Sequence, residues 1–326
     1  IVYRRHTNFS MEAIQQTING SRGTTGGGSG TVTISRNGDL VHKIYVTSDT
    51  AGITDGDELI ADVELEIGGQ RIDRHYAQWM QIWNELSTTG AKADGLKSMQ
   101  GCFGASGASA GQLGTVQVPL QFWFCRNPGL ALPLIALQYH EVKLKFNWGT
   151  GYGATGNSDC NVICDYIYLD TDERRRFAQV SHEYLIEQVQ RHAGEAGATT
   201  KLNFNHPVKE LIWTGPTTPG TTRLKLNGHD RFSEQPTEYF QLRQPYDYHT
   251  AVPRQNLPDA ALIPTNDLTN LEPIVPVSNT SALAALSPSY LGLGVAADTT
   301  TPDTCYYSLA TQLGATTGDN VPVGNL

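Results

Sequence analysis

"ADVELEIGGQRID", residues 61–73, decides the fold class of this chain. Apolar and acidic residues alternate along its first half, which is the pattern of a strand with one dry face and one wet face. The dry face consists of Ala61, Val63, Leu65 and Ile67, and the wet face of Asp62, Glu64 and Glu66. Gly68 and Gly69 then supply the backbone freedom for a turn. The stretch predicts two antiparallel strands joined at a tight corner.

Further strand-like segments lie on both sides of this corner and are separated by glycine-rich turns. They cover residues 10–18, 31–46, 115–125, 127–148 and 160–170. With 33 Gly and 16 Pro against 17% charged residues, the pattern favours an all-β, two-sheet sandwich over an open α/β sheet.

Residues 127–148 are predicted to change environment midway. The apolar run up to Leu137 indicates a crossing that is buried on both sides, and the partial alternation from Gln138 onward indicates a half-exposed strand. Pro119 and Pro133 indicate points where strands begin or end, because proline cannot donate to a ladder.

A single helix is expected to interrupt these strands. Its apolar stripe recurs at three- and four-residue steps through Tyr76, Trp79, Met80, Trp83 and Leu86. The tryptophans could form a stacking platform for sugars or bases, but helical spacing on one face favours core packing. A further short helix is expected near Asp172–Gln179.

The length of 326 residues favours two domains. The charged stretch 169–192 and the small-residue tract 193–200 place a linker at 181–200, between a first domain at 1–180 and a second at 201–326. Strands are expected at 201–214, 222–232 and 237–248. From about residue 247 the periodicity is weak, which predicts a long loop insertion.

Charge and apolar content exclude several classes of function. A net charge of −9 and a pI near 5.4 oppose direct nucleic-acid binding. No run approaches the roughly 20 apolar residues of a membrane-spanning helix. The five cysteines are irregularly spaced, so a reduced, intracellular origin fits better than a disulfide scaffold.

Candidate chemical motifs are incomplete. Cys160 and Cys164 predict a buried thiol pair rather than half of a zinc site, since no second Cys/His pair accompanies them. Ser181, His182 and Glu183 are sequence neighbours without a nucleophile elbow. The run Asp172–Arg176 indicates an ion-pair network between domains or subunits rather than a phosphate grip. We expect no catalytic, cofactor-binding or metal-binding residues.

Two other features leave alternatives open. The carboxylates near residues 62–73 could serve a glycan-cleaving enzyme, although a solvated strand face is favoured. The tract 25–30 lacks the Lys-Ser/Thr of a phosphate-binding loop, so flexibility is the expected role. Glycosylation sequons occur at Asn8, Asn19 and Asn279, and Asn279 is the expected site if one is modified.

Seven blocks of sequence, in a specific order, resemble the double jelly-roll major capsid proteins of nucleocytoplasmic large DNA viruses, of the algal virus and iridovirus type. They are residues 2–10, 35–40, 63–73, 119–144, 166–190, 202–213 and 226–232. The positions of the family signature are Gly68, Gly69, Arg71, Pro119, Pro128, Pro133, Glu173, Arg174, Pro207, Asn227 and Arg231.

The resemblance implies two tandem antiparallel eight-stranded jelly-roll sandwiches with short helices and long loops. It implies a non-enzymatic homotrimer, a pseudo-hexagonal capsomer that tiles a large icosahedral shell. The implied partners are neighbouring capsomers, minor capsid proteins and a nearby internal membrane that is not spanned, with neither nucleic acid nor a small-molecule substrate bound. Assembly is expected in the cytoplasm of the infected cell.

Residues 251–326 do not match the closing strands of that family. We therefore expect an incomplete second jelly roll that continues beyond Leu326, and residues before Ile1, with the segment from about 247 forming a tower on the outer surface. The alternative reading is a carbohydrate-binding or glycan-cleaving β-sandwich.

Overall fold

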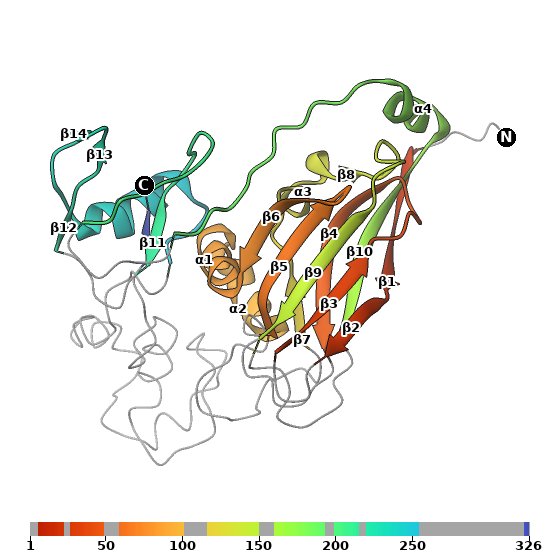
Figure 1. The fold of residues 1–326 in the computed structure, drawn as a ribbon, viewed down its shortest axis with the longest axis horizontal. Coiled ribbons are helices and arrows are strands. Elements are labelled where there is room, and N and C mark those ends of the chain that lie inside the picture. The colour runs from red at the N-terminus through yellow and green to blue at the C-terminus, as the bar shows by residue number, and fades with distance from the viewer. Residues whose placement is uncertain are drawn as a thin grey trace, which may run out of the picture. The chain divides into compact units, whose positions relative to one another are not determined.

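The chain folds mostly into β-sheet with few helices (Figure 1). The structure is a computed structural model that describes residues 6–22, 27–48, 59–100, 116–149, 160–192, 199–214, 220–253 and 323–325. The chain divides into two compact units, the first of residues 1–84 and 89–206 and the second of residues 85–88 and 207–326.

The first unit contains two antiparallel five-stranded sheets. Sheet A has the order β1 (Phe9–Gln16), β10 (Cys160–Leu169), β4 (Leu40–Ser48) and β7 (Val116–Pro119), and β8 (Leu132–Pro133) also pairs with β4. Sheet B has the order β2 (Ile18–Arg22), β3 (Gly28–Thr33), β9 (Val142–Trp148), β5 (Ile60–Ile67) and β6 (Gln70–Tyr76). Most neighbours are distant in sequence, as in the wrapped topology of a jelly roll.

The strand count differs from the eight that were expected. Sheets A and B hold ten strands, of which β8 has only two residues, and β1 and β2 are separated by Thr17 alone. The N-terminal segment therefore passes from the edge of sheet A to the edge of sheet B.

The strand predicted at 61–67 forms β5, with a local correction. Val63 and Leu65 are fully buried in the core, as expected. Ala61, however, is exposed, because the pairing with β9 shifts between Ile60 and Asp62 and leaves Ala61 as the extra residue of a β-bulge.

The predicted corner is confirmed between β5 and β6. Gly68 and Gly69 have φ values of +60° and +85°, the left-handed region that a tight hairpin turn requires. A Cβ on Gly68 would lie 2.6 Å from Nδ1 of His140, so space as well as backbone angle demands glycine there.

Residues 127–148 change environment midway, but the buried run is shorter than predicted, because residues 127–129 are exposed and burial ends before Leu137. After the turn η2 (Pro128–Leu130), residues 131–134 are buried, whereas β9 buries every second residue. The half-exposed strand begins at Val142 rather than near Gln138, and Tyr139 is almost fully exposed.

The structure contains more helices than the sequence predicted. The expected helix forms as α1 (Ala77–Ser87), but α2 (Gly90–Gln100) and α3 (Trp123–Arg126) were not expected. α3 lies in a run in which Phe122, Trp123 and Phe124 are all buried, and a continuous apolar run does not distinguish strand from helix. The short helix near 172–179 is confirmed as α4 (Thr171–Gln179).

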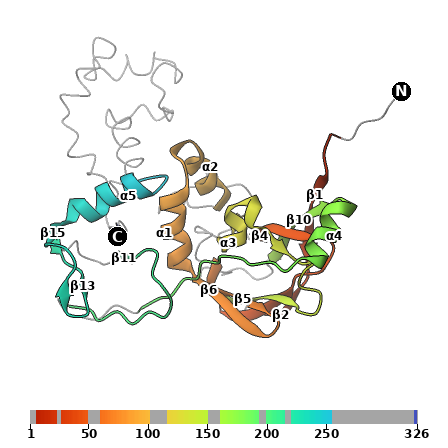
Figure 2. The same cartoon turned by 90° about the horizontal axis from the view of Figure 1, so that it is seen from above.

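The core of the first unit lies between the two sheets and is closed by helices on one side. Figure 2 shows α1 and α2 at the β6 side, opposite the edge formed by β1 and β2. The largest fully buried side chains of this core include Tyr166, Phe122, Phe124, Phe146 and Met80. Their burial drives the two sheets together.

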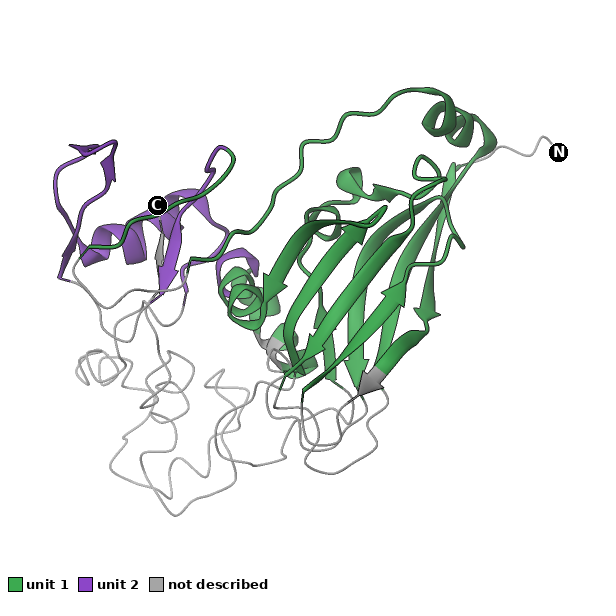
Figure 3. Ribbon diagram, viewed as in Figure 1, with its two compact units in different colours: residues 1–84, 89–206 green, residues 85–88, 207–326 purple. Residues whose placement is uncertain are grey.

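The described part of the second unit (purple in Figure 3) contains short strand pairs. β11 (Ile212–Thr214) pairs with β16 (Val323–Asn325), β12 (Thr221–Thr222) with β15 (Gln235–Pro236), and β13 (Lys225–Leu226) with β14 (His229–Asp230). Of the expected strand 201–214, only β11 is paired. The expected segment 222–232 is a hairpin.

The strand predicted at 237–248 was wrong. This segment forms η3 (Tyr239–Arg243), a π-helical turn, followed by α5 (Gln244–Tyr248). Its aromatic residues favoured a strand, but Pro245 lies in the first turn of α5, where its missing N–H costs nothing. The loop insertion expected from about 247 lies mostly outside the described residues.

Candidate functional site

The acidic face of β5 is neutralised by bases on the neighbouring strands. Nη2 of Arg74 donates to Asp62 at 3.0 Å, and Nη1 of Arg71 donates to Glu64 at 3.2 Å. Lys145 pairs with Glu66. The hydrogen bond from Arg74 to Asp62 raises the pKa of that guanidinium. The carboxylates form an ion-pair ladder rather than the solvated face that was favoured, since Asp62 is buried and each of the three has a basic partner.

The motif at residues 181–183 is structural. The His182 ring hydrogen-bonds through Nε2 to the carbonyl of Phe177 at 2.8 Å, and it stacks on the Phe177 ring at 5.1 Å. A histidine that caps the last carbonyls of a helix stabilises that helix end. His182 therefore closes α4 instead of activating a nucleophile.

Two of the buried cysteines are protonated thiols. Cys125 and Cys164 are free and buried, and Cys160 is buried as well. Burial raises the pKa of Cys125 to about 12 and also raises the pKa of Cys164. Metal ligation needs a thiolate, and no group of three metal-ligating side chains occurs among the residues that the structure describes.

The predicted tryptophan stripe is packed rather than open. Met80 and Leu86 are fully buried. Trp79 stacks on Trp83 at 5.6 Å, and the guanidinium of Arg126 lies 4.0 Å from the Trp83 ring centroid. Neither indole is free to stack on a sugar or a base.

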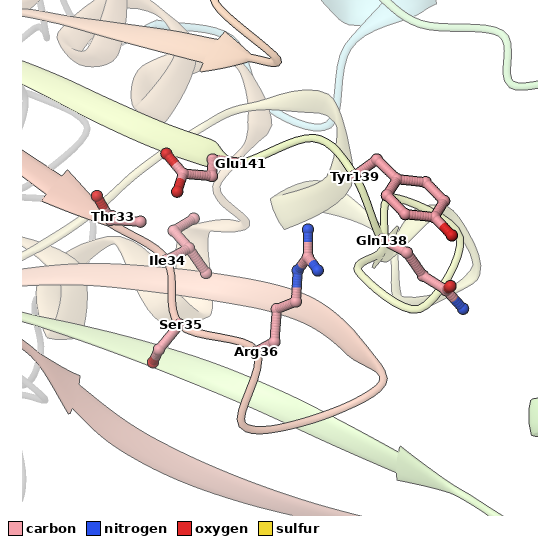
Figure 4. Close-up of a pocket in the computed structure, with 7 residues that line it drawn as sticks. All are labelled: Thr33, Ile34, Ser35, Arg36, Gln138, Tyr139 and Glu141. Carbon is pink, nitrogen blue, oxygen red and sulfur yellow. The ribbon is translucent and has the colours of Figure 1, made fainter.

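An open hollow of about 370 Å³ lies at one end of the first unit (Figure 4). Nη2 of Arg36 donates to the carbonyls of Leu137 and His140, at 2.7 and 3.3 Å, so this guanidinium fastens the loop beside it. Figure 4 shows the Tyr139 side chain directed away from Glu141. The hollow therefore lacks the convergent aromatic and acidic groups of a sugar site.

The predicted signature positions in the first unit lie at turns and strand ends. Arg71 pairs with Glu64, and Pro119 is the last residue of β7, opposite Tyr45. Pro128 begins η2, and Pro133 in β8 lies opposite Leu40.

Two further signature residues lie in α4. Glu173 is in its first turn, where a negative charge complements the helix dipole. Nε of Arg174 lies 3.0 Å from Oδ1 of Asp39, whose Oδ2 accepts a hydrogen bond from the Leu169 amide. Arg174 thus fixes α4 to the end of sheet A.

The remaining signature residues lie in the second unit. Pro207 is its first residue after the boundary at His206. Asn227 has a φ of 52° and precedes Gly228 in the turn of the β13–β14 hairpin. The Arg231 amide donates to the carbonyl of Leu224 at 2.9 Å. Asn279 lies outside the described residues, whereas the sequons at Asn8 and Asn19 are exposed.

Sequence reasoning missed a clasp that holds the expected linker against β6. Oδ1 of the buried Asp73 accepts the amide of Val189 at 3.0 Å, and Nε2 of Gln188 donates to the carbonyl of Ile72 at 2.6 Å. Nη1 of Arg126 donates to Glu187 at 2.7 Å. Glu187 and Val189 are half-buried, whereas Gln188 between them is exposed. The signal available in the sequence is only their spacing of two residues, which suits an extended segment with one inward face.

A buried polar pair lies behind this clasp. Nε2 of His75 is 2.8 Å from Oδ2 of Asp73, and both side chains are about 1% exposed. This contact does not have hydrogen-bond geometry, and neither atom has another hydrogen-bond partner among the described residues. His75 stacks on Phe122 at 4.4 Å. In the part of the chain that the structure describes, the linker rather than another strand lies along the β6 edge of sheet B.

The comparisons with known proteins agree on one family. Residues 1–170 match the family described as major capsid protein N-terminus, and residues 173–219 match large eukaryotic DNA virus major capsid protein. The major capsid protein of Pyramimonas orientalis virus is 55% identical over 78% of this chain and 70% of its own length.

Two further relatives extend this result. The major capsid protein of Paramecium bursaria Chlorella virus 1 is 39% identical over 75% of this chain and 71% of its own length. The major capsid protein of Phaeocystis pouchetii virus is 43% identical over 65% of this chain and 53% of its own length. A solved chain from the PBCV-1 virus capsid superposes with a TM-score of 0.64 at 36% identity, over 78% of this chain and 77% of that one.

Proposed function

This chain belongs to the major capsid protein family of large eukaryotic DNA viruses, and on that premise we propose that it assembles as a homotrimeric, pseudo-hexagonal capsomer. It is a structural component of the virion capsid and not an enzyme. Each chain would contribute two tandem jelly rolls, so that a trimer presents six similar sandwiches and tiles an icosahedral shell.

The observation that carries the proposal is the topology of the first unit. Its two sheets pair strands that are far apart in sequence and enclose one apolar core. The division of the chain into two compact units, with a boundary at His206, supports two domains. The proposed bounds are a first jelly roll at 1–180, a linker at 181–200 and a second jelly roll from 201.

A capsomer of this kind would contact other components of the virion. They are neighbouring capsomers, minor capsid proteins and an internal membrane that the chain approaches without crossing, with assembly in the cytoplasm of the host. Among the described residues, no helix has both the length and the apolar character needed to cross a bilayer.

Sedimentation of the purified full chain tests the proposal. A stable species of three times the chain mass of 35.5 kDa is expected, because permanent complexes bury roughly 2,000–5,000 Å² and remain associated on dilution. Electron microscopy of that species should show a pseudo-hexagonal outline. A monomer at every concentration would contradict the proposal.

A further inference from the structure

The clasp continues to residue 191. The guanidinium of Arg191 lies 4.9 Å from the ring centroid of Tyr76, the last residue of β6. Residues 187–191, termed here the strap, therefore follow β6 from Ile72 to Tyr76, and the contacts that hold them there involve side chains.

The strap is not a strand of sheet B. It forms no backbone–backbone hydrogen bond with any part of the chain that the structure describes, whereas β5 and β6 are joined by a backbone ladder. Paired strands open together with the core of a protein, and a segment held by few contacts opens at a lower free energy. The strap is therefore expected to separate from β6 before the sheets unfold.

The segment that precedes the strap does not oppose this movement. Residues 183–186 form no backbone–backbone hydrogen bond within the described part of the chain, and Leu185 is 90% exposed. On their N-terminal side lies α4, whose end is capped by His182. Residues 183–186 can therefore move while α4 stays in place.

Closing the strap leaves buried polar atoms without hydrogen-bond partners. These atoms are Oδ2 of Asp73 and both ring nitrogens of His75, and each of the two side chains is about 1% exposed. Burial of an unpaired polar atom costs free energy, which hydration recovers once water reaches the atom. Hydration of Asp73 and His75 therefore lowers the cost of opening the strap.

We propose that the strap is a cover on the β6 edge that opens and closes while both sheets stay folded. When closed, it keeps water from Asp73 and His75 and occupies an edge where another strand could otherwise pair. When open, it admits water to both side chains. All of these residues belong to the first unit, so the cover would operate in a single chain as well as in the proposed capsomer.

Hydrogen exchange of the unmodified full chain, resolved to single amides, measures the opening. The Val189 amide, which donates to Asp73, should exchange at least about 100-fold faster than the Val162 amide in the centre of sheet A, because it needs only local opening. At low urea concentrations the exchange rate at Val189 should hardly change, since local opening exposes little surface. Exchange at Val162 should rise with urea.

Diethyl pyrocarbonate, which modifies accessible imidazoles, reports the opening at His75. The double variant Gln188→Ala with Arg191→Ala removes two contacts of the strap and leaves Asp73 and His75 in place. Modification of His75 and exchange at Val189 should each become about 10-fold faster, the effect of losing two weak contacts. His140 is exposed and serves as the internal reference, whose modification should not change.

Gln15→Ala is the matched control. Nε2 of Gln15 donates to Oδ1 of Asn161 at 2.7 Å, an exposed side-chain hydrogen bond between β1 and β10. Loss of this bond affects the closed and the open strap equally, so neither exchange at Val189 nor modification of His75 should change.

Four results would overturn the cover. If the Val189 amide shares the rate and the urea dependence of Val162, the strap leaves β6 only when the whole unit unfolds. If the double variant changes neither readout, the removed contacts do not hold the strap. If Val189 exchanges faster but His75 is modified no faster, the strap moves without admitting water to the buried pair. If Gln15→Ala accelerates both readouts as strongly, the effect does not belong to the strap.

Discussion

Replacing Asp73 with alanine is expected to destabilise the first unit by about 2–4 kcal/mol. Oδ1 of this buried side chain accepts two amides, that of Arg74 at 2.8 Å and that of Val189 at 3.0 Å. Removing the acceptor leaves both donors unpaired, at roughly 1–2 kcal/mol each in partly buried surroundings. Asp73→Asn keeps one acceptor oxygen and should cost about half as much.

Urea denaturation followed by tryptophan fluorescence measures this change, with Asp230→Ala as the control. Asp230 is half exposed and lies 3.3 Å from Arg223, and such a surface pair contributes about 1 kcal/mol or less. Hydrogen exchange at the Val189 amide adds a local readout, because the exchange should accelerate when its acceptor is lost.

Two results together would contradict the role of the clasp. If Asp73→Ala unfolds within about 0.5 kcal/mol of the unmodified chain, and if the Val189 amide exchanges at the same rate, the clasp does not hold the linker. A loss of stability without faster exchange at Val189 would assign the role of Asp73 to its contacts with Arg74 and His75.

Three further changes have definite expected outcomes. Gly38→Ala should lower the free energy of unfolding by about 1–3 kcal/mol, because the added Cβ would lie 2.7 Å from Cβ of the fully buried Tyr166. Thermal melting measures this change, and a variant as stable as the parent would contradict the close packing at Gly38. The pKa of Cys125 is raised from 9.0 to about 12 in the folded state, so its contribution to stability is complete below pH 9 and is lost as the pH rises towards 12. Cys125→Ala should therefore reduce the loss of unfolding free energy between pH 9 and 12, measured by urea titration. An unchanged loss would argue against the raised pKa. Lys145→Ala removes the partner of Glu66 on an exposed face and should cost less than about 1 kcal/mol, with the difference shrinking in high salt.

Local patterns predicted the parts of the fold that depend on local chemistry. The alternation in 61–67 and the paired glycines at 68 and 69 predicted a strand and a corner, since side-chain period and positive φ are properties of the segment itself. The bulge at Ala61 was missed because it arises in the pairing with β9 and has no separate signal in β5.

The segments whose structure was predicted wrongly are those that depend on contacts with distant parts of the chain. The run through Phe122 and Phe124 is apolar on every side, so its composition fits a buried helix turn as well as a strand. The clasp joins Asp73 to Val189 across 116 positions, and no short window contains both partners. Leu185 was likewise indistinguishable from a buried apolar residue until its surroundings were known.

The register of β1 with β10 sets the order of events during synthesis. Phe9 pairs with Leu169 and Gln16 with Val162, so β1 emerges from the ribosome long before β10, the strand it pairs with in sheet A. At 5–20 residues per second the delay is roughly 10–30 seconds, during which the apolar side of a nascent β1 is open to wrong pairing. Efficient production should therefore depend on folding helpers or on slow, cool expression, and truncation anywhere before residue 162 should give an insoluble product.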